Sequence, residues 1–118
     1  IFCNNFSKHV FENNLIKSRI EMALLKGIKI DIIVQANPES LDLIKQIQQW
    51  AENKLPIRFL VDTKNLVSIC PVNFAVMDGT GYRFEPNKEK QEAHVCMNDP
   101  KRSAMLEDAF YKLFSLLN

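Results

Sequence analysis

The stretch IKIDIIV, residues 28–34, most constrains what this chain can fold into. Its residues are β-branched and apolar, apart from Lys29 and Asp31. This pattern is typical of a central strand that is covered on both faces, and such strands belong to parallel or mixed sheets flanked by helices. The segment therefore predicts an α/β domain with a parallel or mixed sheet.

Helical patterns precede and follow this strand. Before it, apolar residues recur at spacings of three, four and seven, which predicts a helix over about residues 8–26, with Ser7 as N-cap and Gly27 as the left-handed residue after its end. After it, Asn37 and Pro38 form a helix start, as cap and first helical residue. The buried stripe of this second helix is expected at Leu41, Ile44, Ile47, Trp50 and Ala51.

Four further segments have the character of strands. Residues 1–4 predict a short first strand and residues 57–62 a third, whereas TKNLVSIC, residues 63–70, fits either a loop or a strand. VNFAVMD and GYRFEP predict a hairpin, in which the turn Gly79-Thr80-Gly81 supplies positive φ at little cost. The order of elements is β-α-β-α-β, followed by consecutive strands and a last helix.

The C-terminal part combines an alternating segment with an amphipathic one. Residues 92–98 predict a strand with Ala93, Val95 and Met97 on one face and Glu92, His94 and Cys96 on the other. Asp99 and Pro100 then repeat the signal of a cap followed by proline. The apolar stripe of the last helix comprises Met105, Leu106, Ala109, Phe110, Leu113, Phe114 and Leu117.

Size and composition indicate a single domain, residues 1–118, which we expect to be part of a longer polypeptide because it begins at Ile1 without a methionine. A net charge of +1 gives no global attraction to nucleic acid or anionic lipid, and no apolar run is long enough to span a membrane. Three widely spaced cysteines suit reduced thiols, so we expect a cytoplasmic protein.

Motifs for cofactors and metals are missing from the sequence. There is no GxGxxG, GxxxxGK[ST] or GxSxG, so we expect no nucleotide cofactor and no hydrolase elbow. Glu92, His94 and Cys96 share a strand face, but structural zinc usually takes four ligands including a close pair such as CxxC. We therefore expect no metal.

The chain resembles one half of the phospholipase D superfamily over most of its length. Three segments carry the resemblance: the helix running into a glycine and a strand in ALLKGIKIDIIV, the hairpin FAVMDGTGYRFEP, and the closing section QEAHVCMNDPKRSAMLEDAFYKLF. The first two look like the family's entry to the sheet and the strand that carries HxKxxxxD. The third looks like its later strand with Glu and its last helix. The resemblance implies a mixed sheet with helices on both faces, of phospholipase D-like type.

The signature itself is degenerate in this sequence. With Asp78 set on the Asp of HxKxxxxD, the His falls on Pro71 and the Lys on Asn73. The family's chemistry needs an imidazole nucleophile, a lysine to neutralise phosphate charge and a second half that protonates the leaving group. Pro71 and Asn73 supply neither of the first two. We therefore expect a non-catalytic domain that acts in ligand binding, regulation or protein interaction, within a larger bacterial or archaeal protein.

Two alternative functions stay open from the sequence, as does a different fold, flavodoxin-like or Rossmann-like, in which case the resemblance misleads. One is a phosphodiesterase or nuclease whose reactive residues come from outside this chain. The other is a nucleic-acid-binding module, and its basic residues would be Lys26, Lys29, Arg58, Arg83, Lys88 and Lys90.

The resemblance also implies a partner and a site. Two halves meet in the family, so we expect a homodimer or a contact with a second phospholipase D-like half. The surface of this contact, and any ligand, is expected around Asn73, Asp78, Glu92 and His94. Asn73 and His94 would form hydrogen bonds to a ligand, and the two carboxylates would orient their neighbours.

Overall fold

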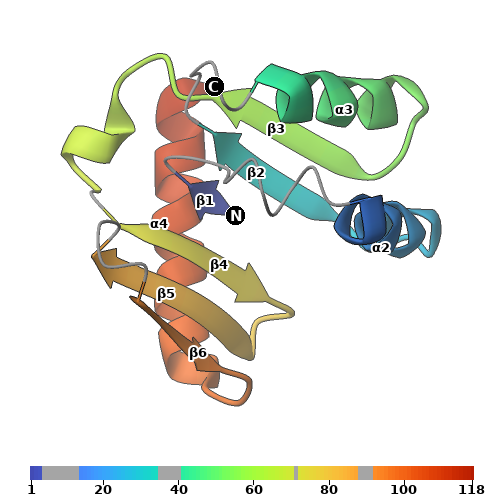
Figure 1. Ribbon diagram of the computed structural model, residues 1–118. Coiled ribbons are helices and arrows are strands. Elements are labelled where there is room, and N and C mark those ends of the chain that lie inside the picture. Colours follow the sequence, from blue (N-terminus) through green and yellow to red (C-terminus); the bar gives the residue numbers. More distant parts are fainter. Residues whose placement is uncertain (4–13, 35–40, 71, 88–91) are drawn as a thin grey trace.

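The computed structural model describes residues 1–3, 14–34, 41–70, 72–87 and 92–118. In this part of the chain, six strands form one sheet in the order β3-β2-β1-β4-β5-β6 (Figure 1). β1, β2 and β3 are parallel, and β4, β5 and β6 are antiparallel to their neighbours, so the sheet is mixed, as predicted. The strands are β1 (Phe2–Cys3), β2 (Ile30–Val34), β3 (Ile57–Val61), β4 (Asn73–Met77), β5 (Gly81–Asn87) and β6 (Glu92–Cys96).

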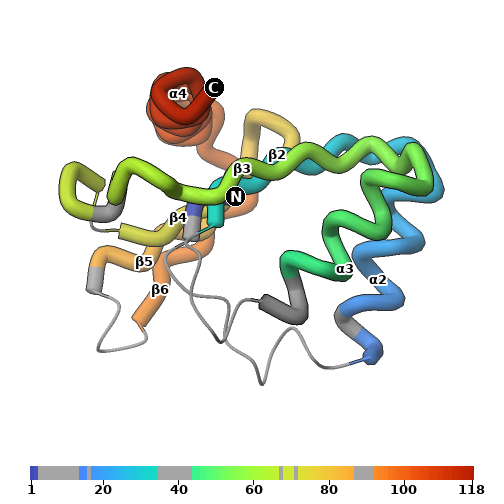
Figure 2. Tube along the Cα trace, turned by 90° about the horizontal axis from the view of Figure 1, so that it is seen from above, coloured from blue at the N-terminus to red at the C-terminus, as the bar shows by residue number. Residues whose placement is uncertain are grey.

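Helices cover both faces of the sheet. α2 (Asn14–Leu25) and α3 (Leu41–Glu52) lie on one face, and α4 (Pro100–Leu117) lies on the other (Figure 2). The α/β architecture with helices on both faces is therefore confirmed. Among the described residues, no helix is long and apolar enough to cross a membrane.

The two faces have separate cores because β2 is apolar on both sides. Ile32 and Val34 point toward α2 and α3, whereas Ile33 points toward α4. The buried members of the first core, the α2–α3 core, are Leu24, Ile32, Val34, Ile44, Ile47, Trp50 and Ile57. Those of the second, the α4 core, are Phe2, Ile33, Leu66, Phe74, Phe110, Leu113 and Phe114. The described members of the stripes predicted for the second and last helices are thus buried or partly buried, with the exception of Met105, which is 65% exposed.

The ends of the first two helices are described only in part. Gly27 has φ of +87°, which confirms it as the left-handed residue after α2. The caps predicted at Ser7 and Asn37, and Pro38 after the latter, lie outside the described residues. The ambiguous segment 63–70 contains a short 3-10 helix, η2 (Leu66–Ser68), and no strand.

The predicted hairpin is formed by β4 and β5, but its turn differs from the expectation. Positive φ falls on Asp78 (54°) and Gly79 (70°), and not on Gly81. Gly81 is the first residue of β5, and a Cβ there would lie 3.4 Å from the carbonyl oxygen of Cys96 on β6, which is an ordinary van der Waals contact. The left-handed turn agrees with the twist of a tight hairpin, in which Asp-Gly is favoured.

The start of α4 is fixed by its predicted cap. The Asp99 carboxylate accepts a hydrogen bond from the Arg102 backbone N–H at 3.0 Å, and Pro100 is the first helical residue. The backbone N–H of Asp99 donates to the carbonyl of Thr80 at 2.7 Å. The hairpin turn therefore sets the position at which α4 begins.

Candidate functional site

The four predicted site residues lie at different places on the antiparallel half of the sheet. Asn73 opens β4, and Asp78 follows the end of the same strand. At about 3.3 Å per residue, this separates them by about 16 Å. Glu92 and His94 belong to β6, the outer strand beyond β5. Asp78 therefore lies at the opposite end of the strands from Asn73 and Glu92.

Asn73 and His94 are also separated by the sheet itself. Phe74 packs in the α4 core, so Asn73 lies on the other face by strand alternation. His94 is opposite Phe84 in the register, and Phe84 packs against the α4 core. The structure thus does not bring the four residues into one crevice, and the ligand role of each stays a prediction. Pro71 lies outside the described residues.

Asp78 lines a cavity of about 590 Å³, which we call the Asp31 cavity. It lies between α4 and the ends of the strands at which β2 begins and β4 finishes. The residues that line it are Ile1, Lys29, Asp31, Arg58, Phe74, Val76, Asp78, Gly79, Glu107, Phe110 and Tyr111.

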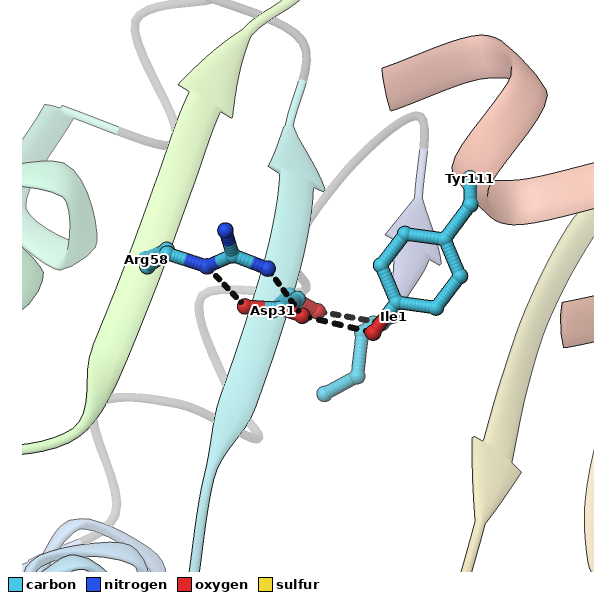
Figure 3. Close-up of polar contacts among 4 residues, drawn as sticks. All are labelled: Ile1, Asp31, Arg58 and Tyr111. Carbon is cyan, nitrogen blue, oxygen red and sulfur yellow. Dashed lines mark hydrogen bonds and ion pairs between the residues drawn. The ribbon is translucent and has the colours of Figure 1, made fainter. Parts of the chain in front are cut away.

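A polar network contributes Asp31, Arg58 and Tyr111 to the lining of this cavity. Figure 3 shows the hydrogen bonds among these three side chains. Asp31 on β2 is directly opposite Arg58 on β3, and the guanidinium donates two hydrogen bonds to the two carboxylate oxygens, from Nε at 2.8 Å and from Nη2 at 2.9 Å. The hydroxyl of Tyr111 on α4 donates to Asp31 Oδ2 at 2.7 Å. The Arg58 guanidinium also lies 5.2 Å from the ring centroid of Phe114. We call these four side chains the Asp31 network.

The network favours the ionised form of Asp31. Hydrogen bonding to Arg58 lowers the pKa of the Asp31 carboxyl, and this outweighs burial, which raises it. Hydrogen bonding to Asp31 raises the pKa of Tyr111. Because both oxygens of Asp31 already accept hydrogen bonds, the carboxylate is poorly suited to take a proton from a substrate. Through these hydrogen bonds, Asp31 links β2 to β3 and to α4.

The sequence carries a signal for this network that is separate from any motif. Asp31 interrupts an otherwise apolar strand, and a carboxylate in a central strand needs a partner. The sequence alone marks Arg58 only as a basic residue and Tyr111 only as part of the last helix. Their meeting depends on strand register and on the helix face that packs against the sheet.

His94 lines a second cavity, of about 550 Å³, which we call the Phe84 cavity. It lies between the β5–β6 edge of the sheet and the N-terminal half of α4. The residues that line it are Tyr82, Phe84, Pro86, His94, Arg102, Met105 and Leu106. Its walls are mainly apolar, in contrast to those of the Asp31 cavity.

The described residues contain no group of three or more His, Cys, Asp or Glu side chains that could hold a metal ion. Glu92, His94 and Cys96 do share one face of β6, as predicted, since His94 and Cys96 are opposite Phe84 and Tyr82.

The basic residues considered for nucleic acid do not form one stripe in the described part of the chain. Lys29 and Arg58 line the Asp31 cavity on the α4 side of the sheet. Arg83 alternates with Tyr82 and Phe84, so it lies on the other face, where it pairs with Glu85 at 3.3 Å. Lys88 and Lys90 lie outside the described residues.

Comparisons with protein-family models, with curated proteins and with solved structures found no match. Any functional conclusion therefore rests on the arrangement of the residues themselves.

Proposed function

We propose that the chain is a non-catalytic phospholipase D-like domain that acts in ligand binding, regulation or protein interaction. The order of its elements supports the proposal: parallel strands with their helices, then the β4–β5 hairpin with Asp78 in its turn, then β6 with Glu92 and His94, and α4. These elements match the segments that carry the resemblance.

The conclusion that the domain is non-catalytic rests on the residue at the lysine position of the signature. Asn73 opens β4, and its amide has neither the charge to neutralise a phosphate nor the nucleophilicity to form a covalent intermediate. His94 lies on the opposite face of the sheet and cannot replace the missing imidazole near Asn73. The Asp31 network offers a carboxylate whose two oxygens are occupied.

The experiment is a hydrolysis assay on the purified chain with bis(p-nitrophenyl) phosphate and with plasmid DNA. We expect rates equal to the blank for the wild type and for Asn73→Ala, without added metal and with magnesium. Hydrolysis above the blank that is lost in Asn73→Ala would contradict the proposal and favour an active phosphodiesterase.

A partner that contributes a second half is the next part of the proposal. Asn73 and Glu92 lie at the same end of the antiparallel strands, and we propose this end as the contact with a second copy or a second phospholipase D-like half. Light scattering should give about twice the 13.6 kDa mass of the chain, and Asn73→Arg should return it to the single-chain value because a two-fold contact is altered on both sides. A single-chain mass for the wild type at all micromolar concentrations would argue against a homodimer.

We also propose a cytoplasmic location. Cys96 is a free thiol on an outer strand, and such thiols persist where the surroundings are reducing. Fractionation of cells that express the protein from its own gene tests this, and recovery from an oxidising compartment would contradict it.

A further inference from the structure

The Phe84 cavity combines an apolar interior with a cationic rim. Its volume of about 550 Å³ falls within the range of roughly 300–1,000 Å³ that is usual for small-molecule sites. It lies on the α4 side of the sheet, whereas Asn73 lies on the other, and it shares His94 with the surface predicted for a second half.

The apolar walls come from both the sheet and the helix. Phe84 and Leu106 are partly buried against the α4 core and present their remaining surface to the cavity. Met105 adds a thioether side chain that is 65% exposed. Met side chains adapt their shape to a ligand, and flat aromatic or branched aliphatic groups fit between such walls.

Among the polar groups of the cavity, the Arg102 guanidinium is a donor that favours an anion. The Arg102 guanidinium is 3.4 Å from the Tyr82 hydroxyl and 3.7 Å, through Nε, from the Asp99 carboxylate. Of the five N–H groups of a guanidinium, these contacts engage two and leave three for another acceptor. His94 contributes an imidazole to the same cavity. Among the described lining residues, none carries a negative charge.

From this arrangement we infer a binding site for a small molecule with an apolar body and one carboxylate. The body lies between Phe84, Met105 and Leu106, and the carboxylate pairs with Arg102 at the rim. Arg102 is suited to this role because its planar fork matches the two oxygens of a carboxylate. The inference does not depend on the phospholipase D-like proposal, because none of these residues belongs to the degenerate signature.

The experiment compares two probes of the same shape, 2-naphthoate and its neutral amide, 2-naphthamide. Calorimetry with the purified chain should show naphthoate binding about tenfold or more tightly than naphthamide, which corresponds to one charge-assisted contact. In Arg102→Gln the two probes should bind equally. Lys101→Gln is the matched control, since Lys101 is exposed on the same turn of α4 and does not line the cavity. It should keep the wild-type preference.

Amide chemical shifts locate the bound probe. Naphthoate should shift the signals of residues 82–86 and 102–106 in wild type, and Met105→Glu, which places a negative charge in the wall, should abolish these shifts while leaving the unfolding midpoint close to wild type. The inference would be overturned if the shifts were centred on the Asp31 cavity, or if naphthoate did not bind at millimolar concentration. It would also be overturned if both probes bound equally to wild type, or if Arg102→Gln kept the preference for naphthoate. The hydrolysis assay with Asn73→Ala is independent of all these outcomes.

Discussion

Replacing Phe110 by alanine tests whether α4 holds the domain together. Phe110 is 5% exposed in the α4 core, with ring centroids 5.2 Å from Tyr111 and 5.7 Å from Phe114. Loss of its buried surface costs up to about 3 kcal/mol. A void of roughly 80 Å³ adds about 2 kcal/mol at about 24 cal/mol per Å³ if it stays empty. Because Phe110 also lines the Asp31 cavity, water can enter part of this void, so we expect about 3–4 kcal/mol in total.

Urea unfolding followed by the fluorescence of Trp50 measures this loss. Trp50 is the only tryptophan, it is 3% exposed, and it belongs to the α2–α3 core on the other side of the sheet. Its signal should report a distant substitution only if the domain unfolds as one unit, which coincident circular dichroism would verify. Leu116→Ala, at a position that is 49% exposed on the same helix, is the control and should change stability little. An unchanged midpoint for Phe110→Ala would refute the role given to this core.

Three further outcomes are expected from local features. The Asp31 carboxyl has a lowered pKa in the folded state, so its contribution to stability is present above its unfolded pKa of about 3.9 and is lost as the pH falls through the folded value. In Asp31→Asn, the urea midpoint should therefore fall less steeply as the pH is lowered than it does in the wild type. Ser103 is fully buried and, in the described part of the chain, its hydroxyl has no hydrogen-bond partner, so Ser103→Ala should raise the unfolding free energy by about 1 kcal/mol in the same assay. Gly79→Ala should lower the free energy of unfolding by about 1 kcal/mol because φ is +70° there, although nothing lies within 4 Å of an added Cβ. These arguments would be contradicted, in turn, if Asp31→Asn kept the wild-type pH profile, if Ser103→Ala lowered the free energy of unfolding, or if Gly79→Ala left it unchanged.

The elements could be predicted from the sequence because their signals are local. IKIDIIV has apolar residues at both strand parities, and the structure buries Ile32 and Ile33 on opposite faces. The stripe of the last helix and its Asp99 cap were sufficient to define α4. In the hairpin, the expected positive φ was wrong at Gly81, because the turn falls on Asp78 and Gly79 and Gly81 already pairs with Met77 as the first residue of β5.

The arrangement of the candidate site could not be predicted in the same way. Grouping Asn73 with Asp78 relied on the spacing of a motif, but five residues of extended chain place them at opposite ends of a strand. The partner of Asp31 depends on the register of β2 with β3, which sets Arg58 opposite it. The Phe84 cavity is formed by residues from two strands and a helix, and its shape is a property of packing that no single segment encodes.

In the described part of the sheet, the fewest residues pair between strands at the centre, where β1 meets β4. The contacts of α4 with both halves of the sheet are therefore important for holding the halves together. β1 has two residues, and its register with β4 consists of the pair of Phe2 with Phe74. Within the described residues, the parallel half and the antiparallel half are therefore joined through this one register pair. α4 packs across both halves: Tyr111 reaches Asp31 in the parallel half, Arg102 reaches Tyr82 in the antiparallel half, and Lys64, which follows β3, donates to the Leu116 carbonyl near the end of the helix. Since the Asp31 cavity spans this junction and the Phe84 cavity lies within one half, a change in the angle between the halves would reshape the first cavity more than the second.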